Sequence, residues 1–149
     1  YTVWLLERSM KTLAIRVKAH NKNAKKIARW LHQHPLVDHV YYPGLKTHPH
    51  YKLAKKQMNG YTGMLSFELN ESVNSETFLK SLALIKPSMS LAGVESTILA
   101  PSKASHALLG EEERKRQGIS EGLLRLSVGI EDTKDLLLDL EKAFEMSTI

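Results

Sequence analysis

A short apolar run with an arginine inside it, Leu123–Val128, constrains the fold of this chain most strongly. Its length and apolar content predict a strand. Leu124 and Leu126 then point to one face, and Arg125 shares the opposite face with Ser127. A buried guanidinium is costly unless an anion meets it, and its planar fork binds a carboxylate through two parallel hydrogen bonds. Arg125 therefore either binds an anion, with a substrate carboxylate as the expected one, or projects from an edge strand toward water or a glutamate.

Upstream of this strand, the run Ser90-Leu-Ala-Gly-Val-Glu-Ser96 consists mainly of small residues and predicts an irregular turn. Small residues let backbone N–H groups approach a ligand, and Ser90 can add a hydroxyl. Glu95 is either a base or a residue that caps a helix or pairs with a lysine. The turn and Arg125 together look like half of a binding site, although an ordinary loop crossing is the alternative for the turn.

The remaining patterns alternate between helix and strand. Residues 3–34 carry apolar side chains at helical spacing and predict one long helix, or two in line, that Pro35 ends. Further helices are predicted at 50–58, from an N-cap at Ser75, at 111–117 and at 132–144, and further strands at 37–42, 62–69 and 97–100. This alternation predicts a single α/β or α+β domain with a sheet of about three to five strands covered by helices.

Composition excludes several classes of protein. The 149 residues suffice for one domain with a sizeable core, and no apolar run approaches the length of a membrane span. The absence of cysteine excludes disulfides and thiolate chemistry and fits a cytoplasmic protein. Much of the net charge of +5 comes from residues 18–29, whose lysines fall mostly opposite the apolar face of the predicted helix. No aromatic residues are interleaved with them, so this run predicts a solvated face and not a nucleic-acid site.

The histidines do not form a convincing metal site. Two His-x-His pairs, His32/His34 and His48/His50, flank prolines, and no third ligand stands at a suitable distance. We therefore expect no metal. His106 is expected to be structural, and no nucleophile elbow, phosphate loop or dinucleotide fingerprint is present.

Several blocks, in this order, resemble the C-terminal domain of the pyridoxal-phosphate enzymes of cysteine and methionine metabolism, which include cystathionine β-lyase, cystathionine γ-synthase, cystathionine γ-lyase and methionine γ-lyase. The blocks are Leu6–Leu13, His34–Gly44, Gly63–Leu69, Ser90–Ser96, Ser105-His106 and Arg125–Asp132. The resemblance implies the small C-terminal domain of a fold-type I enzyme over residues 1–149, with a mostly antiparallel sheet and a long N-terminal helix. The chain lacks an initiator methionine, and we expect it to be a fragment without its upstream cofactor-binding domain.

The resemblance also implies the roles of individual residues. The cofactor is pyridoxal 5'-phosphate, bound through a Schiff-base lysine in the upstream domain, so no catalytic residue is expected here and the fragment alone should be inactive. Arg125 is implied to bind the substrate α-carboxylate, and Ser90 to border that carboxylate and the cofactor. Ala92 stands where the family usually has glycine, which would be strained if the turn needs a positive φ.

Met89 bears on the type of reaction. Members that act at the γ-carbon often carry an acidic residue at its position, so Met89 favours a cystathionine β-lyase, which releases homocysteine, pyruvate and ammonia. A cystathionine γ-synthase or γ-lyase is the alternative, and a non-catalytic amino-acid-binding or assembly module is the alternative of another class. The implied partners are a sulfur amino-acid substrate, the upstream domain and identical subunits in a cytoplasmic homotetramer, with no nucleic acid and no membrane.

Overall fold

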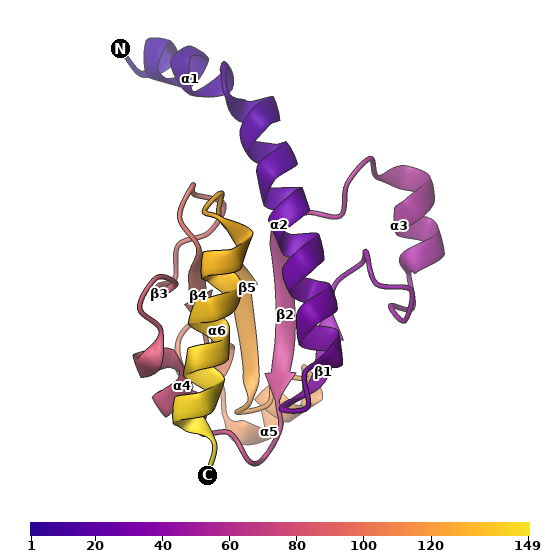
Figure 1. Cartoon of the computed structure of the whole chain (residues 1–149), viewed down its shortest axis with the longest axis vertical. Coiled ribbons are helices and arrows are strands. Elements are labelled where there is room, and N and C mark those ends of the chain that lie inside the picture. Colours follow the sequence, from indigo (N-terminus) through magenta and orange to yellow (C-terminus); the bar gives the residue numbers. More distant parts are fainter.

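A five-stranded sheet with the order β1-β2-β5-β4-β3 organises the computed structural model, which describes all residues 1–149 (Figure 1). The strands are β1 (Val37–Tyr41), β2 (Met64–Leu69), β3 (Lys86–Pro87), β4 (Thr97–Leu99) and β5 (Leu123–Ser127). Neighbouring strands run antiparallel except β3 and β4, which are parallel. The prediction of a mostly antiparallel sheet in a mixed α/β domain is therefore confirmed. The two-residue β3 was not predicted, because two residues that include a proline carry no periodic pattern.

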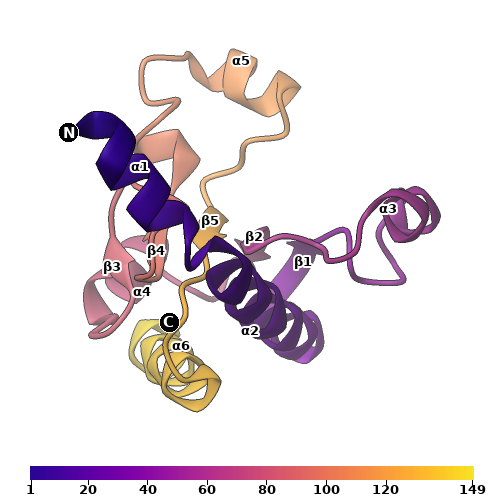
Figure 2. The same ribbon diagram turned by 90° about the horizontal axis from the view of Figure 1, so that it is seen from above.

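Six α-helices and one 3-10 helix surround the sheet. They are α1 (Thr2–Met10), α2 (Leu13–Gln33), α3 (Tyr51–Gln57), α4 (Ser75–Ser81), the 3-10 helix η1 (Pro101–Lys103), α5 (Glu111–Arg116) and α6 (Thr133–Ser147). Seen from above, α2 and α6 cover one side of the sheet, whereas α1 and α5 lie toward the other (Figure 2). No helix is both long and apolar enough to cross a membrane.

The hydrophobic core lies between the sheet and the pair α2 and α6. In β2 and β5, alternate residues face this core, and Phe67 pairs directly with Leu124. Phe78 of α4 packs between Phe67 and Phe144 of α6, with ring centroids 6.2 and 4.8 Å away. Burial of these side chains stabilises the fold at roughly 25 cal/mol per Å² of apolar surface. The opposite face of β5 is thereby left for Arg125 and Ser127.

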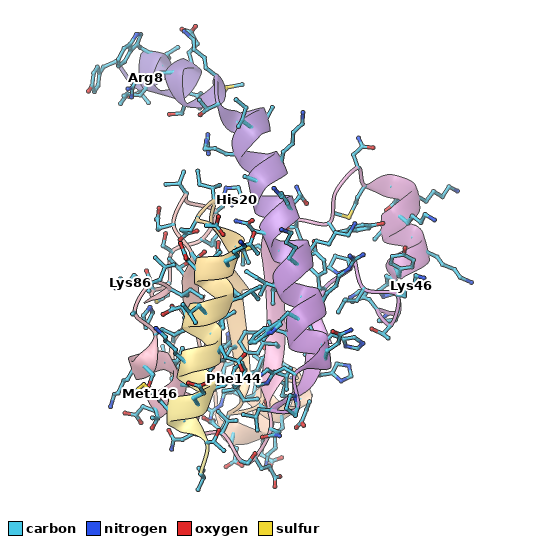
Figure 3. All side chains as sticks on the ribbon, viewed as in Figure 1. Arg8, His20, Lys46, Lys86, Phe144 and Met146 are labelled. Carbon is cyan, nitrogen blue, oxygen red and sulfur yellow. The ribbon has the colours of Figure 1, made fainter.

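The N-terminal helix is two helices that meet at Lys11 and Thr12, and α1 extends away from the sheet together with the first turns of α2 (Figure 1). None of the α1 residues is buried. His20 is the first buried residue of α2, and Figure 3 shows it near the level where this helix meets the sheet, with Arg8 far beyond. Leu13 and Val17 belong to the same apolar stripe as the buried residues further along, yet they remain 45% and 44% exposed.

The cap of α4 differs from the prediction by one residue. Ser75 is the first residue of the helix, and Asn74 is its N-cap. The Asn74 Oδ1 accepts hydrogen bonds from the N–H groups of Glu76 and Thr77 at 3.1 and 2.9 Å. Both asparagine and serine are strong N-caps, so the sequence Asn-Ser offers two starting points that propensity alone does not separate.

Candidate functional site

Arg125 lies in the middle strand of the sheet. In the register, Ser66 of β2 stands opposite Arg125 on one side and Leu99 of β4 on the other. The alternative of an edge-strand arginine is therefore wrong. Its two chain neighbours, Leu124 and Leu126, are fully buried on the core face, so Arg125 projects from the face that α2 and α6 leave uncovered.

The guanidinium of Arg125 is half-buried and almost without partners in this chain. Its one side-chain hydrogen bond runs from Nη2 to the carbonyl oxygen of Met89 at 3.2 Å. Its Nε is buried and has no hydrogen-bond partner, and no carboxylate forms an ion pair with it. Arginine carries five N–H donors, and a buried unsatisfied donor is costly. The arrangement can therefore accept an anionic group that satisfies the remaining donors.

The turn predicted at residues 90–96 lies beside Arg125, because the Met89 carbonyl is the acceptor of its hydrogen bond. Ser90 is exposed, and its own carbonyl accepts a hydrogen bond from Thr97 Oγ1 at 2.7 Å. The Ser90 hydroxyl has no partner and is free to meet a ligand. Met89 is 66% exposed, and its backbone carbonyl accepts the hydrogen bond from Arg125. The structure thus brings together Arg125, Ser90 and Met89.

Ala92 adopts the left-handed conformation that the resemblance warned of, with φ at +62°. Its N–H donates to Ser127 Oγ at 2.9 Å, so the strand holds the centre of the turn. A Cβ in this region of φ/ψ space costs roughly 1–2 kcal/mol relative to the right-handed region. Thr62 is the other residue besides glycine with a positive φ, at +74°.

Sequence reasoning missed the contact between Glu131 and Ser96. The N–H and Oγ of Ser96 donate to the two carboxylate oxygens of Glu131, at 2.6 and 2.9 Å, and Gly129 N–H donates to Ser96 Oγ at 2.8 Å. Ser96 is buried. The two residues are 35 positions apart, and nothing in their local patterns signals the pairing. Glu95, which sequence analysis singled out as a base or an ion-pair partner, is exposed and its carboxylate makes no hydrogen bond or ion pair.

The histidines serve local structure. His106 Nδ1 hydrogen-bonds to the neighbouring Ser105 Oγ at 2.8 Å, and His48 Nδ1 accepts from His50 N–H. His34 stacks on Phe144 with ring centroids 4.0 Å apart, and burial lowers its pKa although Glu141 opposes this shift. His20 Nδ1 donates to the carbonyl of Val128 at 2.6 Å. No group of three or more histidine or acidic side chains is arranged to hold a metal ion.

The sequence and the fold of this chain both match those of a known enzyme family. The chain belongs to the Cys/Met metabolism PLP-dependent enzymes, whose sequence model matches residues 1–145. Pyridoxal phosphate is thus the cofactor of the family.

Individual relatives include both β- and γ-lyases. The chain is 46% identical over 142 residues to a cystathionine beta-lyase of Lactococcus lactis, covering 95% of this chain and 37% of the relative. It is equally identical, over the same length, to a cystathionine gamma-lyase of Bacillus subtilis, of which it covers 38%. The chain therefore spans little more than a third of the length of these relatives.

Solved structures agree with the fold. The crystal structure of a cystathionine gamma-lyase from Lactobacillus plantarum, complexed with L-serine, superposes with a TM-score of 0.92 at 45% identity, over 97% of this chain and 38% of that one. A cystathionine gamma synthase from Xanthomonas oryzae, in complex with cystathionine, gives a TM-score of 0.87 at 43% identity, over 93% and 36% of the two chains. The predicted family and fold-type I architecture are confirmed.

Proposed function

We propose that this chain is the C-terminal, substrate-binding domain of a cystathionine β-lyase, and that Arg125 binds the α-carboxylate of the substrate. The proposal rests on the surroundings of the Arg125 guanidinium. It stands in the central strand, half-buried, with one hydrogen bond to a backbone carbonyl and no carboxylate partner. A carboxylate is the anion whose geometry matches the planar fork of arginine.

The role of Arg125 is orientation. Two hydrogen bonds from one rigid guanidinium would fix both the position of the α-carboxylate and the rotation of the α-carbon, and such orientation contributes to the rate. The cofactor, when bound, draws electrons away from the α-carbon of the substrate. The carboxylate group remains unchanged during this chemistry, so Arg125 acts by positioning and takes no proton.

The residues of this chain fit one edge of a cofactor site and not the whole of it. The exposed Ser90 hydroxyl has no partner and can border the cofactor. The lysines that flank the turn in the sequence are otherwise engaged, since Lys86 Nζ donates to the Ala83 carbonyl and Lys103 Nζ lies 3.9 Å from a Glu76 oxygen. We therefore propose that the lysine that binds the cofactor belongs to an upstream domain and that this chain alone is inactive.

Met89 supports the β-lyase over a reaction at the γ-carbon. Its thioether cannot pair with a distal ammonium group as an acidic side chain would, and its side chain is exposed next to Arg125. The relatives keep the γ-lyase open, because a β-lyase and a γ-lyase match this chain with the same 46% identity.

The test is product analysis with the intact protein that contains this chain, loaded with pyridoxal phosphate and given L-cystathionine. Homocysteine, pyruvate and ammonia, formed with uptake of one water, support the β-lyase. Cysteine, 2-oxobutyrate and ammonia would show a γ-lyase. In a parallel reaction given an activated homoserine and cysteine, formation of cystathionine would show a γ-synthase. Binding of an amino acid without any product would show a non-catalytic module. We also propose that the intact protein is a homotetramer, which its mass in solution tests.

A further inference from the structure

Hydrophobic burial contributes little to holding the turn beside Arg125. None of the residues 89–95 is buried. The segment also carries the left-handed Ala92, a conformation that an unrestrained alanine avoids. Polar contacts must therefore determine where this turn lies, and through it where the Met89 carbonyl meets the Arg125 guanidinium.

Glu131 forms the strongest of these contacts. Its two carboxylate oxygens accept from the N–H and the hydroxyl of Ser96, at 2.6 and 2.9 Å, where the turn joins β4. Both bonds are charge-assisted, and such bonds are roughly twice as strong as neutral ones. The hydroxyl of Ser96 also accepts a hydrogen bond from Gly129 N–H, so this hydroxyl both donates and accepts.

Glu131 itself is fixed from the core side. Asn23 of α2 donates through Nδ2 to the carbonyls of Gly129 and Glu131, at 3.2 and 2.8 Å, and Thr133 Oγ1 donates to Asn23 Oδ1 at 2.7 Å. Asn23 and Thr133 are both buried. The carboxylate of Glu131 therefore extends from a backbone that is anchored to Asn23 of α2, which is itself bonded to Thr133 of α6, and it reaches outward to the turn.

A short series of hydrogen bonds along the turn links Glu131 to Arg125. Beyond Ser96, the Ile130 N–H donates to the Val94 carbonyl at 2.9 Å, and the Ala92 N–H reaches Ser127 Oγ. At the start of the turn, Met89 carbonyl accepts from Arg125 Nη2. The segment is thus tied at its end by Glu131, at its centre by β5, and at its beginning by Arg125.

We infer that Glu131 is a positioning residue: by fixing Ser96 and the turn, it sets the direction in which Arg125 presents its free N–H groups to the substrate carboxylate. The inference rests on the proposed function of Arg125 and adds a residue to it. Loss of the carboxylate would let the turn shift, and the hydrogen bond to Met89 would pull the guanidinium with it. A misplacement of about 1 Å in a binding group can cost up to about 100-fold in rate.

The test uses the intact enzyme with its cofactor and the variant Glu131→Gln, which keeps the size of the side chain but puts an NH₂ donor against Ser96. Asp132→Asn is the matched control. Asp132 is the adjacent acidic residue and caps α6 by accepting from Lys134 N–H, without touching the turn. Glu131→Asp is the second variant; it keeps the charge and shortens the reach by one methylene. Amide hydrogen exchange of residues 90–96 and steady-state kinetics are measured for all variants.

Two substrates distinguish an effect on the carboxylate contact from a general loss of activity: S-ethyl-L-cysteine and its α-carboxamide. The carboxamide cannot form the charged pair with Arg125. We expect Glu131→Gln to raise the KM for the carboxylate substrate by about tenfold, with a smaller change in kcat, and to speed exchange at 90–96. The already low kcat/KM for the amide should change less than about twofold, since only the carboxylate contact is affected. Glu131→Asp should fall between, and Asp132→Asn should match the wild type in both measurements.

The reference variant Arg125→Lys keeps the two hypotheses apart. If Arg125→Lys raises the KM for the carboxylate substrate and Glu131→Gln does not, Glu131 is not a positioning residue while the proposed function stands. If Glu131→Gln lowers kcat/KM for both substrates equally, its role is structural and the inference is overturned. If Arg125→Lys leaves the preference for the carboxylate unchanged, the proposed function itself fails.

Discussion

Arg125 and Ser127 lie two residues apart on the same face of β5, and they hold the beginning and the centre of one turn: Arg125 Nη2 donates to the Met89 carbonyl, and Ser127 Oγ accepts from Ala92 N–H. A strand fixes the spacing of alternate residues on one face. Arg125 and the turn beside it are therefore held in one rigid frame.

Replacing Arg125 by lysine should raise the KM for L-cystathionine by about tenfold or more in the intact enzyme, with the cofactor still bound. Lysine keeps the charge but cannot form two parallel hydrogen bonds, and a hydrogen bond to a charged group contributes about 1.5–3 kcal/mol. Steady-state kinetics and the cofactor absorbance check this. Arg116→Lys is the control, because Arg116 pairs with Glu113 on the surface and should tolerate lysine. An unchanged KM in Arg125→Lys would remove Arg125 from the site.

Replacing Ala92 by glycine should stabilise the protein by up to about 1 kcal/mol, because glycine adopts a positive φ without the Cβ penalty, although it also loosens the unfolded chain. Urea unfolding measures the change. Ala107 is also exposed and lies outside the regular elements with a negative φ, so Ala107→Gly should lose about 0.4–1 kcal/mol. Equal losses in the two variants would show that Ala92 is not strained.

Replacing Asn74 by alanine should destabilise the protein by about 1 kcal/mol, the usual cost of a lost N-cap. The Asn74 side chain accepts from two backbone N–H groups, and no side-chain hydrogen bond is formed by Ser75. Ser75→Ala should therefore change the free energy of unfolding by a few tenths of a kcal/mol at most. If Ser75→Ala lowered the free energy of unfolding in urea more than Asn74→Ala does, Ser75 and not Asn74 would be the N-cap.

Stability should fall as the pH drops below about 6.5, the ordinary pKa of histidine. Burial lowers the pKa of His34 in the folded protein, so the unfolded chain binds its proton first. The contribution of His34 is therefore fully present above the unfolded pKa and is lost as the pH falls through the folded one. Its ring stacks on Phe144, and its Nδ1 accepts from Leu36 N–H, which protonation would end.

The variant His34→Phe keeps an aromatic ring there and removes the titration. Urea unfolding at about pH 8 and about pH 5.5 should give a smaller difference in stability for this variant than for the wild type. The exposed His32 serves as the control, and His32→Phe should retain the wild-type difference. A pH dependence that survives in His34→Phe would assign it to other groups.

The sequence predicted the elements whose side chains repeat with a clear period. The alternation in Leu123–Val128 placed Arg125 on the face opposite the core, and the structure confirms that placement. Small residues in 90–96 predicted the turn. The glycine that the family usually has at the position of Ala92 raised the question of a positive φ there, and the structure shows φ at +62°.

Other features could not be read from local patterns. Glu131 and Ser96 are 35 positions apart, and each alone resembles a surface residue, so only the packing of β4 beside β5 reveals their contact. The sequence left open whether residues 3–34 form one helix or two in line, because no proline or glycine marks the break between α1 and α2. Leu13 and Val17 continue the apolar stripe of α2 and are nonetheless 45% and 44% exposed, which the periodicity of the sequence cannot show.

Gly129 should be the glycine least tolerant of a side chain. A Cβ at this position would lie 2.3 Å from both a Glu131 carboxylate oxygen and the Val94 carbonyl oxygen, and the second of these belongs to backbone that cannot move alone. Gly129→Ala must therefore push the turn away from β5, at a cost of about 1–3 kcal/mol in the free energy of unfolding. Gly110→Ala is the control, since no atom lies within 4 Å of the added Cβ. Because the displaced turn carries the Met89 carbonyl, Gly129→Ala should also raise the KM for L-cystathionine in the intact enzyme. If Gly129→Ala matched Gly110→Ala in both the free energy of unfolding and the KM, the turn could move without consequence for Arg125.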